Sequence, residues 1–283
     1  MDEVLLVSRC KVNLFLKIGE RLANGYHLLT SLFFPLPYPT DEIKVTLTSE
    51  ESFFLTSNFK FLEQNNILEK CFWLFKKETG FQGGCKVYLN KKVPIGAGLG
   101  GGSANAAVFL NFLNHLLPTP LGKNSLIRIA SQLGADVPFF LFNKPSWVEG
   151  IGEKIEPLAI DLTGLKGLLI CPKIKISTKW AYECWDKIQI SKKSFLTLSA
   201  WINKKSVSQG RIVLLNDFEK IIFHAYPQMR ELKEEMFKLG ACGGGLSGSG
   251  SAMFFLFRET KKQKQAQAVL DKLGLLSYNY SFV

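Results

Sequence analysis

Histidine and paired cysteine, the usual protein ligands of transition metals, are scarce in this sequence. Only three histidines occur in 283 residues, and they lie far apart in the chain. The six cysteines stand singly, and no CxxC spacing occurs. Zinc ribbons and thioredoxin-type redox sites need such spacing, so the sequence argues against both. We expect most of the cysteines to be small buried hydrophobes.

Long apolar runs are also missing. No stretch of about 18 uncharged apolar residues occurs, which is the length that a helix needs to cross a bilayer. The opening stretch MDEVLLVSRC carries acids and lacks the basic region and apolar core of a signal peptide. We therefore expect a soluble, cytoplasmic protein with no membrane partner.

Charge, in contrast, is unbalanced. The sequence has 35 Lys and Arg against 24 Asp and Glu, a net charge of +11. This excess suits phosphate-rich ligands, nucleic acid or an acidic membrane surface, and an ordinary solvated basic surface accounts for it about equally well. Because no RNA-binding signature such as an RNP octapeptide occurs, we do not expect nucleic acid as a partner.

The pattern of local signals predicts an α+β protein. Segments rich in β-formers fill the first sixty residues, with turns expected at NG (24–25) and PTDE (39–42). Helices are predicted from apolar spacing over 65–80, 103–117 and 125–134. Strands and helices mix without a regular βαβ repeat, and a loop-rich region at 144–166 is expected to link two halves. A chain this long exceeds the about 100–200 residues of one domain, so we divide it into 1–155 and 156–283.

The most informative stretch is PIGAGLGGGSANAA (94–107), which holds five glycines and no charged residue before an apolar helix. The N–H groups and dipole at the start of a helix attract anions, and glycines let phosphate oxygens approach the backbone. The stretch contains GxGxxG, but the acid that a dinucleotide fold needs about 20 residues later is missing from HLLPTPLGKNS. A Walker loop is excluded because GK[ST] is absent. A plain turn or linker would not need the apolar residues inside the stretch.

A third kind of phosphate loop does match. The stretch resembles the ATP loop of the GHMP kinases, a superfamily of small-molecule kinases, and GGGLSGSGSAMFFLF (243–257) resembles their C-terminal glycine motif. Further segments resemble the branch that phosphorylates a cytidine diphosphate sugar alcohol: KVNLFLKIGERLANGYHLLTSLF (11–33), LGADVPFFL (133–141), EGIGEKIEPL (149–158) and LNDFE (215–219). The resemblance implies transfer of a phosphoryl group from ATP to the 2-hydroxyl of 4-diphosphocytidyl-2-C-methyl-D-erythritol, a step of non-mevalonate isoprenoid biosynthesis.

The same resemblance implies a two-domain fold, with a ribosomal-protein-like N-terminal domain, a ferredoxin-like C-terminal domain and the active site in the cleft between them. It implies ATP as co-substrate with Mg²⁺, for which no protein ligand is assigned. The residues it places at ATP are Asn66, Pro94, Gly96, Gly98, Leu99, Gly100, Gly101, Gly102, Ser103 and Gly248. For Asn66, a helix N-cap is an equally good interpretation.

Asp136 is the candidate catalytic base. It is the lone acid in the apolar sequence LGADVPFF, which we interpret as a helix end followed by a strand. A buried carboxylate needs a partner, and the resemblance gives Lys11 that role, keeping the aspartate ionised and stabilising the alkoxide that forms on the substrate. The alternatives are a helix or strand cap for Asp136 and an exposed strand-edge lysine for Lys11.

The resemblance also places four side chains at the second substrate. Tyr26 and His27 of the GYH motif would hold the cytosine ring, one by stacking and the other by hydrogen bonding to the base edge. Tyr182 would cover the other face of the base, and Asn13 would contact the substrate. A simple hairpin with a buried aromatic residue explains GYH without a ligand.

Two other functions fit some of these features. One is another GHMP kinase, of the homoserine or mevalonate type, which would have no reason to combine GYH with Lys11. The other is a non-catalytic nucleotide-binding or RNA-binding protein on the same fold, which would not need Lys11 and Asp136 together.

Overall fold

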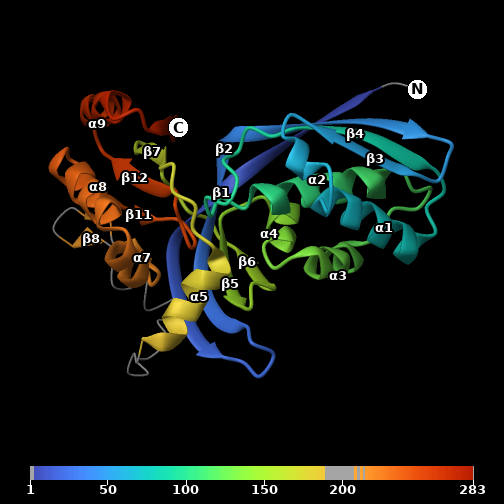
Figure 1. The fold of residues 1–283 in the computed structure, drawn as a ribbon, viewed down its shortest axis with the longest axis horizontal. Coiled ribbons are helices and arrows are strands. Elements are labelled where there is room, and N and C mark those ends of the chain that lie inside the picture. Colours follow the sequence, from blue (N-terminus) through green and yellow to red (C-terminus); the bar gives the residue numbers. More distant parts are fainter. Residues whose placement is uncertain (1–2, 189–206, 209–210, 213, 283) are drawn as a thin grey trace.

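The segment in which the sequence predicts strands forms a long hairpin in the computed structural model of this protein (Figure 1). The structure describes residues 3–188, 207–208, 211–212 and 214–282. At the predicted NG turn, Gly25 takes a φ of +86° and its N–H donates to the carbonyl of Leu22 (2.9 Å). A positive φ suits glycine because it has no Cβ, so the turn at 24–25 is confirmed.

The first sheet has the strand order β10-β1-β2-β4-β3, with β5 added to β2 and β6 paired with β5. Its strands are β1 (Val4–Arg21), β2 (His27–Thr48), β3 (Phe53–Ser57), β4 (Gly84–Asn90), β5 (Ser146–Gly150), β6 (Lys154–Pro157) and β10 (Leu215–Asn216). The helices beside it are α1 (Ile67–Thr79), α2 (Gly101–His115), α3 (Lys123–Leu133) and α4 (Val137–Phe142), and a 3₁₀ turn spans Lys60–Leu62.

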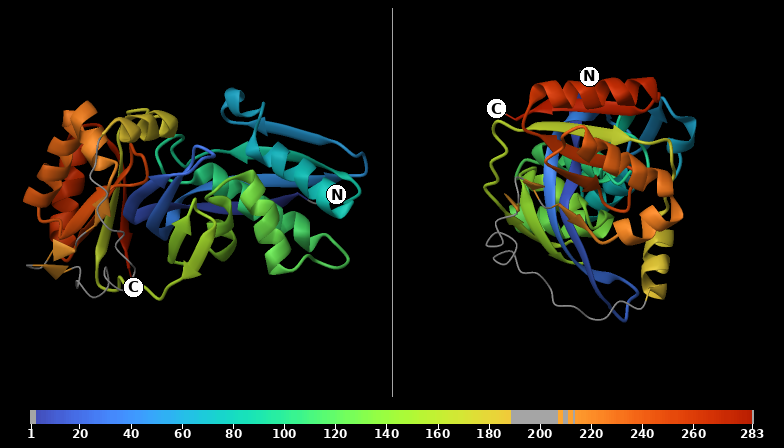
Figure 2. Two further views of the ribbon diagram at one scale, coloured as in Figure 1. Left: turned by 90° about the horizontal axis from the view of Figure 1, so that it is seen from below. Right: turned by 90° about the vertical axis from the view of Figure 1, so that its left-hand side faces the viewer.

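The second sheet is antiparallel, in the order β11-β12-β7-β13. Its strands are β7 (Lys166–Cys171), β11 (Gly243–Leu246), β12 (Met253–Phe257) and β13 (Leu276–Ser281). The helices around it are α5 (Thr178–Lys187), α7 (Glu219–Ala225), α8 (Pro227–Lys238) and α9 (Thr260–Lys272), and the short strands β8 (Val207–Ser208) and β9 (Arg211–Ile212) pair with each other. The left-hand view in Figure 2, like Figure 1, shows α1–α4 towards one end of the molecule and α8–α9 at the other.

The predicted turn at PTDE is wrong, because β2 runs through it as one 22-residue strand. The strand pairs with β1 over most of its length and with β4 near its end. Asp41, expected in the turn, is fully buried, and its carboxylate accepts hydrogen bonds from the N–H groups of Lys92 and Val93 (2.8 Å each). Asp41, which the sequence predicts in a turn, is thus a buried hydrogen-bond acceptor in the structure. Local sequence signals do not show such burial.

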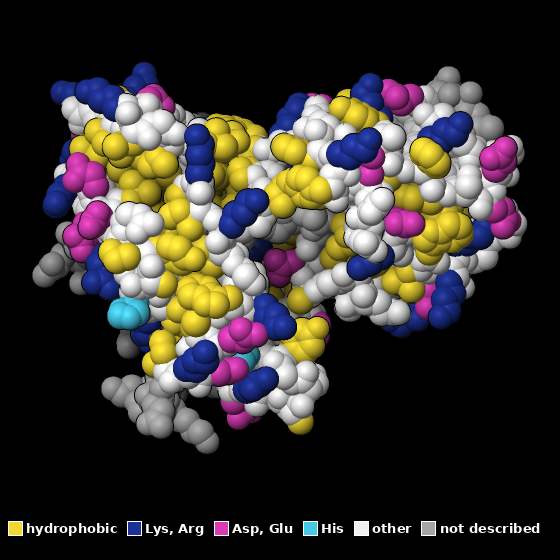
Figure 3. Space-filling model, in the orientation of Figure 1, with side chains coloured by type: hydrophobic (Ala, Val, Ile, Leu, Met, Phe, Trp, Pro, Cys, Tyr) yellow, Lys and Arg dark blue, Asp and Glu magenta, His cyan; other side chains and the backbone are white. Residues whose placement is uncertain are grey.

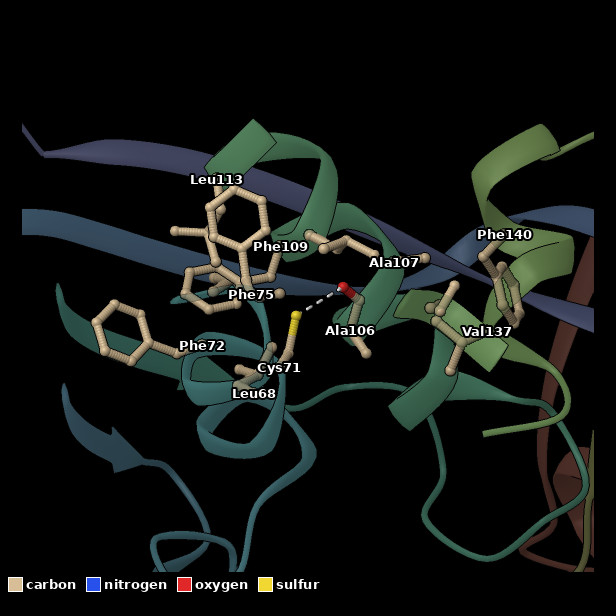
Figure 4. Packing of buried hydrophobic residues seen from close by; sticks show 14 of the residues in the cluster. Leu68, Cys71, Phe72, Phe75, Ala106, Ala107, Phe109, Leu113, Val137 and Phe140 are labelled. Atoms are coloured by element: carbon tan, nitrogen blue, oxygen red, sulfur yellow. Dashed lines mark hydrogen bonds between the residues drawn. The ribbon is translucent and has the colours of Figure 1, made fainter. Parts of the chain in front are cut away.

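The helix predicted over 65–80 is confirmed as α1, and it packs on α2 through aromatic and sulfur-containing side chains (Figure 4). Phe72 and Phe75 of α1 and Phe109 of α2 are fully buried. The Cys71 thiol donates to the carbonyl of Ala106 (3.7 Å). Each buried side chain of this size contributes about 1.5–3 kcal/mol, so this core holds the start of α2 on a rigid base.

Two further expectations change in the structure. The residues after Asp136 form the helix α4 instead of a strand, and the region 144–166 contains the hairpin β5–β6 on the first sheet. Residues 215–216, from the second half of the chain, pair in parallel with β1. The division at 155/156 therefore remains a prediction, while the mixed α and β architecture is confirmed. Within the described part, no helix is long and apolar enough to cross a bilayer.

Candidate active site

The glycine stretch leads directly into the N-terminus of α2, as the sequence predicts. Gly100 is the N-cap residue, with a φ of +67°, and no side chain caps the helix. Gly96 and Gly98 also take positive φ values, of 70° and 76°. The first N–H groups of α2 therefore have no side-chain acceptor, and together with the helix dipole they form a site for an anion.

The glycines of this loop serve two different needs. A Cβ at Gly96 or Gly102 would meet no atom within 4 Å, so the backbone there is open to a ligand. A Cβ at Gly98 would overlap the carbonyl oxygen of Ser247, and one at Gly100 would lie 3.0 Å from the ring of Phe140. The sequence predicts that the glycine at position 98 lets phosphate approach, whereas in the structure the close contact with Ser247 already requires a glycine there.

The second glycine loop, residues 246–252, packs against the first. Ala252 N–H donates to the Ala97 carbonyl (3.1 Å), and the Ser247 hydroxyl donates to the Gly98 carbonyl (3.3 Å). The Asn216 amide donates to the carbonyls of Leu246 and Gly248 (2.8 Å each). Residues 243–257, which the sequence singles out, are thereby brought to the start of α2.

Lys11 and Asn13, on β1, form the polar centre of the site. The Lys11 side chain is only 4% exposed, and its ammonium donates to Asn13 Oδ1 (2.7 Å) and lies 3.5 Å from Asp136 Oδ2. The backbone N–H of Lys11 donates to the Leu99 carbonyl (3.0 Å), which ties this strand to the glycine loop. The alternative of an exposed strand-edge lysine is wrong.

Asp136 immediately precedes α4, but its side chain makes no capping hydrogen bond. The cap interpretation is therefore wrong. The carboxylate is 33% exposed, so it is less buried than the apolar sequence predicts. Burial, with a smaller contribution from the negative charge of Asp136, raises the pKa of Tyr182 to about 12. Asp136 and Tyr182 thus lie near each other, although 46 residues separate them in the chain.

The GYH motif divides into an exposed and a buried residue. Tyr26 is 59% exposed, whereas the His27 side chain is 4% exposed. The imidazole of His27 stacks on the Tyr182 ring, with the centroids 5.0 Å apart and the planes at 16°. Its Nε2 lies 2.7 Å from Asp186 Oδ1. The structure therefore brings His27 and Tyr182 together, while Tyr26 remains accessible at the turn.

Asn66 acts as the N-cap of α1. Its Oδ1 accepts from Leu68 N–H (3.0 Å), and its amide nitrogen donates to the Leu62 carbonyl (2.8 Å). Both ends of the side chain are engaged within the protein, so the cap interpretation is confirmed. A contact of Asn66 with adenine stays a prediction, and the hydrogen bonds of its side chain do not support it.

Sequence reasoning missed a buried network beneath the glycine loop. Lys91 donates to Asp41 Oδ2, and the Asn105 amide, in the orientation that satisfies its neighbours, donates to the same oxygen (2.8 Å). A Cβ at Gly101 would lie 2.7 Å from Lys91 Nζ and 2.9 Å from Val93 Cγ1, so a side chain there would displace one of these neighbours. The two acids of PTDE and the lysine pair at 91–92 were the available signals, but both resemble ordinary surface features.

A metal cage is not found in the described part of the chain, where no three His, Cys, Asp or Glu side chains gather. The surface shown in Figure 3 is hollowed between the two ends of the molecule, with an acidic side chain visible in the hollow. Mg²⁺ is commonly held by one or two carboxylates and substrate phosphates, so a protein cage is not required for it.

Comparison with known proteins identifies the class first. Residues 66–144 match the GHMP kinases N terminal domain, and residues 191–275 match the GHMP kinases C terminal domain. Solved structures of the same architecture include a homoserine kinase from Cytophaga hutchinsonii (TM-score 0.67, 21% identity, 99% of this chain and 94% of that one). The uncapped helix after a glycine loop and these matches define a GHMP kinase.

The relatives narrow this class. A 4-diphosphocytidyl-2-C-methyl-D-erythritol kinase from Nitratidesulfovibrio vulgaris (strain Hildenborough) is 40% identical over 99% of both chains, and one from Lawsonia intracellularis is 38% identical over 97% of this chain and 95% of that one. A crystal structure of 4-(cytidine 5'-diphospho)-2C-methyl-D-erythritol kinase has a TM-score of 0.81 and 29% identity, over 98% of both chains. The chain belongs to this family of kinases.

Proposed function

We propose that this protein transfers the γ-phosphoryl group of ATP to the 2-hydroxyl of 4-diphosphocytidyl-2-C-methyl-D-erythritol. The observation that carries the proposal is the placement of Lys11 and Asp136 beside the start of α2. Lys11 Nζ lies 3.5 Å from the Asp136 carboxylate, and a Cβ at Gly100 would lie 3.3 Å from Lys11 Cε. A proton acceptor, a cation and an anion site therefore occupy one small region.

The phosphates of ATP bind at the N-terminus of α2. The backbone is open at Gly96 and Gly102, and the uncapped N–H groups supply donors to phosphate oxygens. Phosphoryl transfer depends mostly on positioning and on neutralising charge, so fixed backbone donors suit it. Bound together with ATP, Mg²⁺ would supply neutralisation of the negative charge on the transferred group.

Asp136 takes the proton from the substrate hydroxyl. Its carboxylate makes no capping bond and is partly exposed, so an oxygen is free to accept that proton. The nearby ammonium of Lys11 compensates the negative charge that develops on the attacking oxygen. Asn13 orients Lys11 through its Oδ1, and its own amide is fixed by a bond to the Ser31 hydroxyl (2.8 Å).

The cytosine base binds at the GYH turn, with Tyr26 as the exposed stacking surface and His27 at the base edge. Tyr182 supports the imidazole from its stacked position. Tyr26→Ala should raise the KM for the cytidine substrate about five-fold to a hundred-fold, since stacking of a base on an aromatic ring is worth about 1–3 kcal/mol. The KM for ATP should stay near the wild-type value, and an unchanged KM for the cytidine substrate would place the base elsewhere.

Release of ADP from ATP, measured with a panel of alcohols, tests the whole proposal. We expect turnover with the cytidine diphosphate sugar alcohol and none with homoserine or mevalonate. Turnover with either of those would reassign the substrate. ATP binding without turnover of any alcohol, or salt-sensitive binding to RNA, would support a non-catalytic protein. We place the reaction in the cytoplasm because ATP is the donor.

A further inference from the structure

Asp186, near the C-terminal end of α5, reaches across to the hairpin that carries the GYH motif. Its Oδ1 lies 2.7 Å from His27 Nε2, and its Oδ2 lies 3.5 Å from an Arg21 guanidinium nitrogen. The carboxylate is thus held on both oxygens, by residues 159 and 165 positions away. Neither the proton transfer nor the phosphate site uses this contact.

The contact determines which imidazole nitrogen of His27 carries the proton. An ionised carboxylate can only accept hydrogen bonds, so the Nε2 that faces Asp186 must be the protonated nitrogen. In the neutral imidazole, Nδ1 is then an acceptor with a free lone pair. Within the described residues, Nδ1 of His27 has no hydrogen-bond partner, although the side chain is almost entirely buried.

The ring is also fixed in orientation. Tyr182 stacks on it, and Tyr182 in turn packs edge-on against Phe218, with the centroids 5.0 Å apart. A flip of the ring about the Cβ–Cγ bond would place the carbon Cε1 where Nε2 now faces Asp186, so the hydrogen bond would be lost. The stacking and the carboxylate together therefore present one acceptor atom in one direction.

We infer that Asp186 is a positioning residue that makes the site select cytosine over uracil. This inference rests on the proposed binding of a pyrimidine base at the GYH turn. Cytosine carries an exocyclic amino group, which donates a hydrogen bond, where uracil carries a carbonyl oxygen, which only accepts. An Nδ1 that can only accept pairs with the amino group of cytosine and faces the carbonyl of uracil as a second acceptor.

Asp186→Asn tests the inference, because an amide can either donate to or accept from Nε2 and no longer fixes the tautomer. Kinetics are measured with the cytidine diphosphate sugar alcohol and with its uridine counterpart. We expect the ratio of the two kcat/KM values to fall about ten-fold to a hundred-fold, the range for one base-edge contact. The loss should lie in the KM of the cytidine substrate, with kcat and the KM for ATP near wild type.

Two further variants separate positioning from general damage. Glu183→Gln makes the same carboxyl-to-amide change on α5, at an exposed residue that pairs with Lys179 (3.9 Å), and should leave the ratio unchanged. Asp186→Glu retains an accepting carboxylate and should restore much of the selectivity. Retention of the full cytidine preference by a folded Asp186→Asn protein would overturn the inference, as would an equal loss in Glu183→Gln.

Nitrogen-15 NMR of histidine-labelled protein reads the tautomer directly, and three histidines make the assignment simple. We expect a protonated Nε2 and an unprotonated Nδ1 for His27 in the wild type, and a mixed signal in Asp186→Asn. An unprotonated Nε2 in the wild type would overturn the inference. This readout needs no turnover, so it remains decisive if the ADP assay refutes the proposed kinase reaction.

Discussion

Two lysine–aspartate pairs contact the start of α2, and they differ in how fully their hydrogen bonds are satisfied. The Asp41 carboxylate accepts from Lys91, from two backbone N–H groups and from the Asn105 amide, with no exposed surface. In the other pair, Lys11 and Asp136 stand 3.5 Å apart, and a third of the Asp136 side chain is exposed.

The difference distinguishes a pair that stabilises the fold from a pair that we propose takes part in the reaction. A buried polar network with every group paired makes one arrangement rigid, whereas an acceptor with a spare oxygen can take a proton from a ligand. The first pair supports the loop from within the protein, as shown by the closeness of Lys91 to Gly101. The second faces the open side, where we place the substrate.

The largest expected effect is on turnover, from Asp136→Asn. The amide keeps the shape but cannot accept the hydroxyl proton, so kcat should fall about 10²–10⁴-fold. The loss of stability should be smaller than in Asp41→Asn, because a third of the Asp136 side chain is exposed and the Lys11 ammonium keeps its hydrogen bond to Asn13. Steady-state ADP release and thermal unfolding with and without ATP measure both, and ATP should still protect the variant.

Asp271→Asn, an exposed acid of α9, is the matched control and should keep full activity. Lys11→Ala should also reduce turnover, and the double variant should lose much less than the product of the two effects, since the pair acts as a unit. An Asp136→Asn enzyme within a few-fold of wild type would remove the carboxylate from the mechanism, leaving proton transfer to phosphate or water.

Asp41→Asn should act mainly on stability. The change leaves the buried ammonium of Lys91 without a counter-charge, and breaking such a pair costs about 3–5 kcal/mol. Urea denaturation followed by circular dichroism measures the free energy of unfolding. Glu42→Gln is the control, because Glu42 is the next residue and pairs with Lys92 at the surface, where screening makes an ion pair weak. Equal losses in both variants would show that the buried network has no special role.

The resemblance to the GHMP kinases predicted the pairing of Lys11 with Asp136, whereas no sequence signal predicted the pairing of Lys91 with Asp41. Asp136 is conspicuous because its neighbours are apolar, and the glycine loop is conspicuous by composition, so both could be placed from the sequence. Asp41 lies in PTDE, whose local signals favour a turn, and only pairing of β2 with both β1 and β4 draws it into the interior. Burial of this kind depends on partners distant in the chain.

The same limit explains the other differences at the site. Asp186 could not be predicted, because no motif surrounds it in the sequence and its partner His27 lies 159 residues away. The residues after Asp136 contain three phenylalanines, which favour strands, yet they fold as α4 because Pro138 fits the first turn of a helix. The residues lining the site were thus more predictable than the contacts that orient them.

Gly98→Ala tests the glycine loop itself, and we expect a smaller loss in the free energy of unfolding than for Asp41→Asn. Alanine in the left-handed region costs about 1–2 kcal/mol, and the new methyl group would also overlap the carbonyl oxygen of Ser247. The free energy of unfolding should therefore fall by at least that amount. Gly122→Ala, at an N-cap with a φ of −69° and open space around it, is the control and should change stability less. A stable Gly98→Ala protein would show that the two glycine loops do not press on each other.

The smallest stability effect, and one of opposite sign, is expected for Gly102→Ala. Gly102 lies in the first turn of α2, and a methyl group there would meet nothing in the protein. Alanine favours a helix over glycine by about 0.5–1 kcal/mol, so the free energy of unfolding should rise slightly. The methyl group would occupy the space through which phosphate reaches the helix N-terminus. Loss of one charge-assisted hydrogen bond, about 1.5–3 kcal/mol, would weaken ATP binding about ten-fold or more, as measured by calorimetry. A more stable protein with unchanged ATP affinity would mean that the open side of the loop is not where the phosphates bind.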